Sequence, residues 1–172
     1  MPRLLAASIA LLFASALATD ARAHTVVIIV RHAEKAATPA DDPSLSEAGR
    51  ARSERLADIG VGAGVEAVFT SQARRARDTA APLAARRGLT PKVRQVTRET
   101  IDAHIKSLGK EILDTHKGET VLVVGHSNTA PRIAAFLSGQ TIPDLDDATE
   151  FDAIFVVIIP DSGAPRLIRS KY

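Results

Sequence analysis

The chain has 172 residues, of which 45% are apolar, 3% aromatic and 24% charged, with a formal net charge of +2 and no cysteine. This balance is typical of one globular domain, and the lack of cysteine excludes disulfides, thiolate metal sites and cysteine nucleophiles. The scarcity of aromatic residues and the absence of a long basic run argue against a nucleic-acid partner.

The first 23 residues have the pattern of a secretory signal peptide. Arg3 gives a positive start, residues 4–18 are apolar, and Ala21-Arg22-Ala23 offers small residues for cleavage. The apolar run is shorter than the roughly 20 residues that cross a bilayer. We therefore expect residues 1–23 to be a signal peptide, residues 24–172 to be one domain, and the mature protein to be periplasmic or secreted, without membrane attachment.

Strands and helices are predicted to alternate after this segment. Strands are expected at 25–30, 66–70, 92–96, 120–124 and 151–159, with a turn at 160–163 leading into a last strand at 166–169. Helices are expected at 46–59, 73–87, 99–115 and 128–137. In the first helix, Ser46 is a candidate N-cap and Leu56 and Ile59 belong to an apolar stripe. The glycine-rich segment 60–64 after it is predicted to be a turn. Gly88 is expected to end the second helix.

This alternation predicts the fold class. Parallel βαβ units bury a sheet under helices on both faces, and the final turn adds an antiparallel pair. We expect an α/β fold, namely a three-layer α/β/α sandwich with a mostly parallel central sheet and an antiparallel edge.

Two histidines directly follow apolar strands. Arg31-His32 comes after residues 26–30, and Gly125-His126 comes after residues 121–124. Ligands of open parallel sheets bind beyond the carboxyl ends of the strands, so both imidazoles are expected at one edge of the sheet. Either histidine alone could be a hydrogen-bonded structural residue. Two of them, with basic and hydroxyl neighbours, favour a functional site.

A third segment, residues 71–80, follows the second strand and opens a helix with Arg74, Arg75 and Arg77. A helix N-terminus favours an anion, and a guanidinium there can hold phosphate oxygens bidentately. For Arg74 and Arg77, a solvated helix face is at least an equal interpretation.

Together these motifs resemble the histidine phosphatase superfamily, the phosphoglycerate-mutase-like proteins, and in particular a small exported branch. Arg31-His32-Ala33 is similar to the family's Arg-His-Gly, segment 71–80 to its Ser-x-x-x-Arg-Ala-x-x-Thr-Ala, and Gly125-His126 to its apolar strand ending in Gly-His. Segment 45–50 looks like its Leu-Thr-x-x-Gly-Arg stretch. The resemblance covers nearly all of residues 24–172 and implies a phosphoglycerate-mutase-like fold.

The resemblance also implies an activity and its residues. His32 would be the nucleophile of an exported phosphatase that hydrolyses phosphate monoesters or phosphoramidates through a phosphohistidine. Arg31, Arg75 and His126 would bind the phosphate, with no cofactor and no metal. The expected partner is a small phosphorylated substrate or a phosphoprotein. One nitrogen of His32 has to be held by an acceptor, for which a backbone carbonyl is expected.

Two positions depart from the family pattern. Ala33 stands where the family has glycine, which predicts that the backbone there does not need a positive φ. The general acid of the larger members has no recognisable motif. Glu99 is the candidate, Asp102 is the alternative, and Glu34 stays open. Some small members act without such a carboxylate on phosphoramidates or good leaving groups.

Other functions were weighed against the same residues. Ser127 lies in a segment close to a nucleophile elbow, but a serine hydrolase of that type needs a later histidine and none follows. A non-catalytic phosphate-binding protein of the same fold stays an alternative, and a mutase is disfavoured because long insertions are missing. Loops 36–44 and 138–150 are expected to set specificity. The second carries four carboxylates, which could repel highly charged phosphates or merely face water: Asp144, Asp146, Asp147 and Glu150.

Overall fold

The computed structural model describes residues 24–172. The predicted signal peptide, and with it the expected location of the protein, lies outside the described residues. Within them, six strands form one sheet in the order β3-β2-β4-β1-β5-β6. The strands are β1 (His24–Arg31), β2 (Ala67–Ser71), β3 (Lys92–Arg94), β4 (Thr120–Gly125), β5 (Ala153–Pro160) and β6 (Arg166–Lys171).

The direction of the strands agrees with the predicted fold class. β1 pairs with β4, β4 with β2 and β2 with β3, all in parallel. β5 pairs antiparallel with both β1 and β6. The mostly parallel sheet with an antiparallel edge is thus confirmed.

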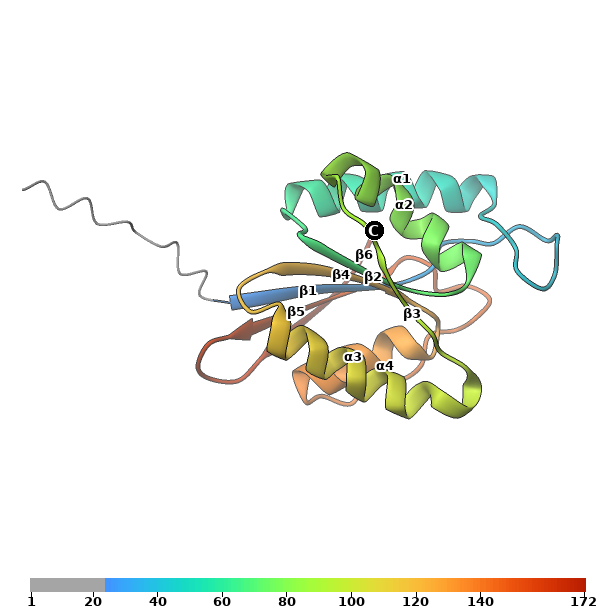
Figure 1. The fold of residues 1–172 in the computed structure, drawn as a ribbon. Coiled ribbons are helices and arrows are strands. Elements are labelled where there is room, and N and C mark those ends of the chain that lie inside the picture. The colour runs from blue at the N-terminus through green and yellow to red at the C-terminus, as the bar shows by residue number, and fades with distance from the viewer. Residues whose placement is uncertain (1–23) are drawn as a thin grey trace, which may run out of the picture.

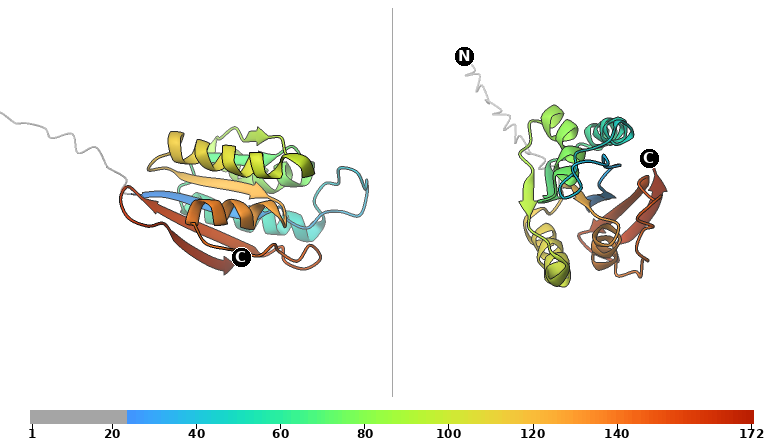
Figure 2. Two further views of the ribbon diagram at one scale, coloured as in Figure 1. Left: turned by 90° about the horizontal axis from the view of Figure 1, so that it is seen from below. Right: turned by 90° about the vertical axis from the view of Figure 1, so that its right-hand side faces the viewer.

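Helices cover both faces of this sheet. α1 and α2 lie on one face, and α3 and α4 lie on the other (Figure 1 and the right panel of Figure 2). The helices are α1 (Glu47–Gly62), α2 (Arg74–Arg87), α3 (Ile101–Thr115) and α4 (Thr129–Ser138), with a short 3-10 helix η1 (Arg98–Thr100) before α3. The three-layer sandwich is therefore confirmed. No helix in residues 24–172 is both long and apolar enough to cross a membrane.

The core is divided in two by the sheet. Val27 and Ile29 of β1 face the cluster that α3 and α4 complete, while Ile28 and Val30 face the cluster beneath α1 and α2. Successive side chains of a strand point to opposite faces. Since both faces of β1 are buried, its sequence is continuously apolar rather than alternating.

The ends of the first two helices follow from their predicted caps. The Ser46 hydroxyl accepts a hydrogen bond from the Gly49 amide at 3.1 Å, as expected of an N-cap. Gly88 ends α2 with a φ of 65°, in the left-handed region that glycine adopts readily. These caps mark where α1 begins and where α2 ends.

Two expectations about α1 were wrong. Leu56 is buried as predicted, but Ile59 is 37% exposed, and the inner face also contains Gly49, Ser53, Ala57 and Gly60. The helix continues to Gly62, so residues 60–62 are helical rather than part of a turn. Close packing explains the small residues on the inner face, because a Cβ on Gly60 would lie 2.4 Å from the Leu83 side chain of α2. Small residues, not large apolar ones, let α1 approach α2.

A methyl group at residue 49 is expected to disturb the segment that carries His32. An added Cβ would lie 2.1 Å from the Glu34 carbonyl oxygen, which accepts a hydrogen bond from the Ser46 amide at 2.9 Å. We expect Gly49→Ala to lower the free energy of unfolding by about 1–3 kcal/mol, the usual range for overpacking. Urea denaturation measures this loss.

Gly62→Ala is the matched control, because a Cβ there would meet nothing within 4 Å. It lies at the end of the same helix, so it is expected to retain the stability of the wild type or to gain slightly from the helix propensity of alanine. Equal stability of Gly49→Ala and Gly62→Ala would contradict the predicted close contact with Glu34.

Candidate active site

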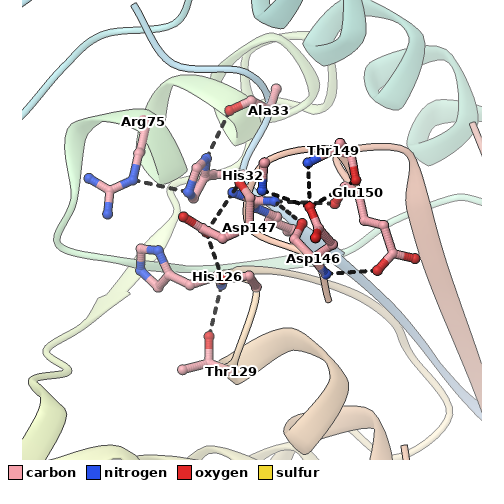
Figure 3. Close-up of polar contacts among 12 residues, drawn as sticks. His32, Ala33, Arg75, His126, Thr129, Asp146, Asp147, Thr149 and Glu150 are labelled. Carbon is pink, nitrogen blue, oxygen red and sulfur yellow. Dashed lines mark hydrogen bonds and ion pairs between the residues drawn. The ribbon is translucent and has the colours of Figure 1, made fainter. Parts of the chain in front are cut away.

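The two histidines singled out in the sequence leave neighbouring parallel strands at the same edge of the sheet. Arg31 at the end of β1 is paired with Gly125 at the end of β4, and the His32 amide donates to the Gly125 carbonyl at 2.9 Å. The rings of His32 and His126 lie 5.3 Å apart, edge to face (Figure 3). The expected convergence of the imidazoles is therefore observed.

The tautomer of His32 follows from its hydrogen bonds. Nδ1 lies 2.8 Å from the carbonyl oxygen of Ala33, and because that oxygen can only accept, Nδ1 carries the proton. Nε2 is then the ring nitrogen with the lone pair, and it accepts a hydrogen bond from Arg75 Nε at 3.0 Å. The backbone carbonyl expected from the sequence is present, and it leaves the lone pair of the ring on Nε2.

His32 is held neutral by its surroundings. The residue is only 4% exposed, and this burial lowers its pKa to about 3, helped by the nearby His126, Arg75 and Arg31. Burial disfavours the charged imidazolium, whereas the bond to Ala33 acts in the opposite direction. Near pH 7 the ring is therefore uncharged and its lone pair is available for attack.

Thr79 connects the His32 segment to α2. Its hydroxyl accepts a hydrogen bond from the Ala33 amide at 2.9 Å and donates one to the Arg75 carbonyl at 2.7 Å. Ala33 is fully buried, and it does not have a positive φ, as its departure from glycine predicted. One threonine thus fixes the backbone behind His32 and the turn of α2 that carries Arg75.

The arginines of the α2 segment divide into two groups. Arg75 points to His32, whereas Arg74 and Arg77 are exposed, and Arg74 pairs with Asp78 on its own helix. Among these three, Arg75 is the one that contacts His32. Arg74 and Arg77 match the interpretation of a solvated helix face.

His126 is also neutral and firmly positioned. Its pKa is lowered to about 4, first by burial and then by the charges of Arg75 and Arg31. The His126 ring nitrogen Nε2 lies 2.9 Å from the Ser71 hydroxyl. The backbone amide of His126 donates a hydrogen bond to the Thr129 hydroxyl at 2.8 Å. Ser71 is the first residue of the 71–80 motif, so the motif supplies both the guanidinium and a contact that orients this imidazole.

Arg31 lies at the site, but its guanidinium is occupied by the loop before β5. The side chain is 1% exposed. It donates to the carbonyls of Asp146, Asp147 and Glu150 and to the carboxylate of Asp147, and it stacks 3.9 Å above the ring of Phe151. The expectation that the four carboxylates repel phosphates or merely face water was thus incomplete, because the carboxylate of Asp147 binds Arg31.

The candidate acids lie apart from the two imidazoles. Glu99 is exposed on η1, and a hydrogen bond from the Thr97 hydroxyl lowers its pKa. Asp102, on α3, is ion-paired with Arg132 of α4. Among the contacts of residues 24–172, none joins either carboxylate to His32. The structure therefore brings together His32, Arg75 and His126 with Arg31, but not the proposed acid.

Glu34, the remaining possibility, is bound to Arg52 of α1. Its two carboxylate oxygens accept from Arg52 Nε at 3.1 and 3.0 Å, and one of them accepts from Nη2 at 2.7 Å. These hydrogen bonds lower the pKa of Glu34. An ionised carboxylate held in this way has no proton to donate to a leaving group.

A cavity of about 280 Å³ opens beside Arg75 and His126. It is lined further by the residues before α2, by the segment that leads into α3 and by the start of α4, namely Gln72, Ala73, Val96, Thr97, Arg98, Ile101, Asn128 and Thr129. Its walls are mixed, with amide, hydroxyl and guanidinium groups as well as apolar side chains.

Ser127 lacks the contacts of a hydrolase nucleophile. Its hydroxyl donates to Asp147 Oδ1 at 2.8 Å, and within residues 24–172 no histidine hydrogen-bonds to it. A serine nucleophile needs a base to take its proton.

No group of three or more histidine, aspartate or glutamate side chains within residues 24–172 is arranged to hold a metal ion.

Comparisons with known proteins agree with the fold. Residues 27–101 match the model of the histidine phosphatase superfamily (branch 1), a segment that includes His32 and Arg75. No curated protein matches the sequence significantly.

Solved structures of two phosphatases and of one hydrolase have the same fold. The chain is similar to the protein histidine phosphatase SixA in its tungstate complex, with 23% identity, a TM-score of 0.63, and coverage of 85% of this chain and 96% of that one. For a mycobacterial glucosyl-3-phosphoglycerate phosphatase the identity is 18%, the TM-score 0.60, and the coverage 86% and 97%. For mycobacterial hydrolase 1 the identity is 18%, the TM-score 0.65, and the coverage 84% and 97%.

Proposed function

We propose that this protein is an exported phosphatase of the histidine phosphatase superfamily, with His32 as its nucleophile. One observation supports this above the others: Nδ1 of His32 is bound to a carbonyl, so Nε2 presents its lone pair to Arg75, next to a second neutral imidazole. The matching family model and the phosphatase folds point to the same chemistry. Export is supported by the sequence of residues 1–23 alone.

The proposed reaction has two steps. Nε2 of His32 forms a bond to phosphorus while the bond to the leaving group breaks, and the leaving group takes the electron pair. Before this attack, substrate binding turns the Arg75 N–H from Nε2 to the phosphoryl oxygens, which frees the lone pair, and His126 contacts the oxygens from the other side. Water next attacks phosphorus, the phosphorus–nitrogen bond returns its electrons to Nε2, and orthophosphate departs. Positive charge around the oxygens stabilises both transition states.

The proposed substrate class follows from the positions of the acid candidates, since no contact in residues 24–172 joins the carboxylates of Glu34, Glu99 or Asp102 to His32. Hydrogen bonds from Arg52 lower the pKa of Glu34, and Glu99 is exposed and also has a lowered pKa. Neither carboxylate is therefore suited to protonate a leaving oxygen. We expect substrates whose leaving group needs no such help, namely phosphoramidates and phosphate esters of acidic alcohols such as phenols. The cavity beside Arg75 and His126 would receive that group.

Hydrolysis of two model esters tests this function. We expect p-nitrophenyl phosphate to be hydrolysed, and an alkyl phosphate to react at least about a hundredfold more slowly, because general acid catalysis usually contributes 10²–10⁴-fold. A phosphoramidate should react as well, and vanadate, which mimics five-coordinate phosphorus, should inhibit. Equal rates for the aryl and alkyl esters would show that an acid is present after all.

The same assay separates the two alternatives. A non-catalytic phosphate-binding protein would bind vanadate or phosphate but release no p-nitrophenol. A serine hydrolase would instead cleave p-nitrophenyl acetate and lose that activity in Ser127→Ala. Either result would overturn the proposed phosphatase.

A further inference from the structure

The guanidinium of Arg31 has hydrogen-bond partners of two kinds. Three of its contacts are to backbone carbonyls: Nη1 to Asp146 at 3.0 Å and to Glu150 at 3.4 Å, and Nη2 to Asp147 at 2.8 Å. The fourth runs from Nη2 to the Asp147 carboxylate at 2.7 Å. A carbonyl leaves only if the loop moves, whereas a carboxylate leaves by rotation of one side chain.

One donor of Arg31 has no partner. Nε is buried and makes no hydrogen bond within the described residues. A guanidinium offers an oxyanion two parallel N–H groups, and Nε together with an Nη forms one such edge. An unpaired buried donor is unfavourable, so Arg31 is left incomplete at the place where an anion can complete it.

The side chain of Asp147 is exposed to solvent, whereas that of Arg31 is buried. Its side chain is 76% exposed, against 1% for Arg31, and its Oδ1 also accepts from the Ser127 hydroxyl, one residue beyond His126. The Ser127 hydroxyl and, to a smaller degree, the charge of Arg31 lower the pKa of Asp147 although partial burial raises it. Asp147 therefore carries its negative charge near pH 7. Figure 3 shows the loop with Asp146, Asp147 and Glu150 beside His32.

From this geometry we propose that Asp147 is an internal anion: its carboxylate occupies the position of a phosphate oxygen on Arg31, and an entering phosphoryl group must displace it. This inference rests on the proposed phosphate site around His32. The backbone carbonyls hold Arg31 in place throughout, so only the Asp147 side chain moves. Displacement then brings the phosphoryl group to Nε and Nη2 of Arg31, next to Nε2 of His32.

This arrangement makes Asp147 a specificity-determining residue. A carboxylate tethered beside its partner competes at a high effective concentration, so weakly charged anions cannot replace it. A dianionic phosphoryl group interacts more strongly with Arg31 and Arg75 than one carboxylate does. The site thus favours phosphoryl dianions over monoanions such as carboxylates.

The test measures the binding of inorganic phosphate by calorimetry, without turnover. Asp147→Asn removes the charge but keeps the size and the backbone carbonyl that binds Arg31. We expect it to bind phosphate up to about fivefold more tightly than wild type, the upper end of the range for the loss of one competing ion pair with an exposed partner. Asp144→Asn, an exposed carboxylate on the same loop, is the matched control and should bind phosphate like the wild type.

Equal or weaker phosphate binding by Asp147→Asn would overturn the proposal. A gain in affinity is informative because damage to the fold lowers binding rather than raising it. Asp147→Ala serves as a second variant with the same expected direction. If Asp147 were instead a catalytic acid, Asp147→Asn would lower kcat for an alkyl phosphate without tightening phosphate binding, which also contradicts the proposal.

The outcome is separable from that of the proposed function. If wild type hydrolyses aryl phosphate but Asp147→Asn binds phosphate no more tightly, the internal anion fails and the phosphatase stands. If wild type hydrolyses nothing while Asp147→Asn gains affinity, the phosphatase fails and the internal anion stands.

Discussion

Replacing His32 by alanine is expected to lower kcat for p-nitrophenyl phosphate by at least about a thousandfold, because the variant has no atom to form the covalent intermediate. The other groups of the site remain, so phosphate should still bind. Binding of vanadate or phosphate therefore separates loss of the nucleophile from loss of the fold. Steady-state kinetics of the purified variant, with a melting curve beside it, measure the effect.

His24→Ala is the control for this variant. His24 is exposed at the start of β1, at the opposite end of the strand from His32. We expect it to retain the activity of the wild type. A His32→Ala variant that is folded and as active as His24→Ala would exclude His32 as the nucleophile.

Arg75→Ala is expected to have the second largest effect, a loss of about 10²–10³-fold in kcat/KM, as for removal of a donor that stabilises developing charge. Arg75 is the residue that touches Nε2 of His32, with Nε at 3.0 Å. Arg75→Lys should recover only part of the loss, because an ammonium lacks the planar pair of donors of a guanidinium.

Arg77→Ala provides the matched comparison. Arg77 lies two residues along α2, is exposed, and carries the same charge. We expect its kcat/KM to change little. If Arg75→Ala and Arg77→Ala lowered kcat/KM to the same extent, the effect would come from the net charge of the helix rather than from a contact with the phosphoryl group.

Much of the fold could be predicted from local signals. Buried parallel strands are continuously apolar, so β1 and β4 stand out in the sequence, and the caps Ser46 and Gly88 mark helix ends. The inner face of α1 could not be predicted in this way. Its contact with Leu83 of α2 depends on the absence of a side chain at Gly60, and its contact with the Glu34 backbone depends on the absence of one at Gly49. Hydrophobic periodicity does not register an absent side chain.

The convergence of the two histidines was predictable because it follows from the order and direction of the strands in the sheet. The ends of neighbouring parallel strands meet at one edge, so His32 and His126 had to lie close together once β1 and β4 were neighbours. The bond from His32 to a backbone carbonyl was also expected in kind, but only the structure identifies Ala33 as the partner. The roles of Ser71 and Thr79 depend on side-chain geometry that no spacing encodes.

The environment of Arg31 was the main omission. A guanidinium that follows a buried strand needs acceptors, and this requirement could have directed attention to the acidic loop 138–150. The sequence does not say which of its carboxylates is used, because Asp147 lies more than a hundred residues from Arg31. The acid candidates fared differently: position after the third strand suggested Glu99 and Asp102, but η1 and α3 direct them to Thr97 and Arg132.

The most direct test of the account is to trap the covalent intermediate on the wild-type protein. The protein is mixed with a ³²P-labelled phosphatase substrate and the reaction is rapidly quenched with alkali. We predict an acid-labile, alkali-stable phosphate on Nε2 of His32, since Nδ1 is bound to the Ala33 carbonyl. Label on Nδ1, on Ser127, or on no residue while substrate is being hydrolysed would contradict the assignment of His32 as the nucleophile.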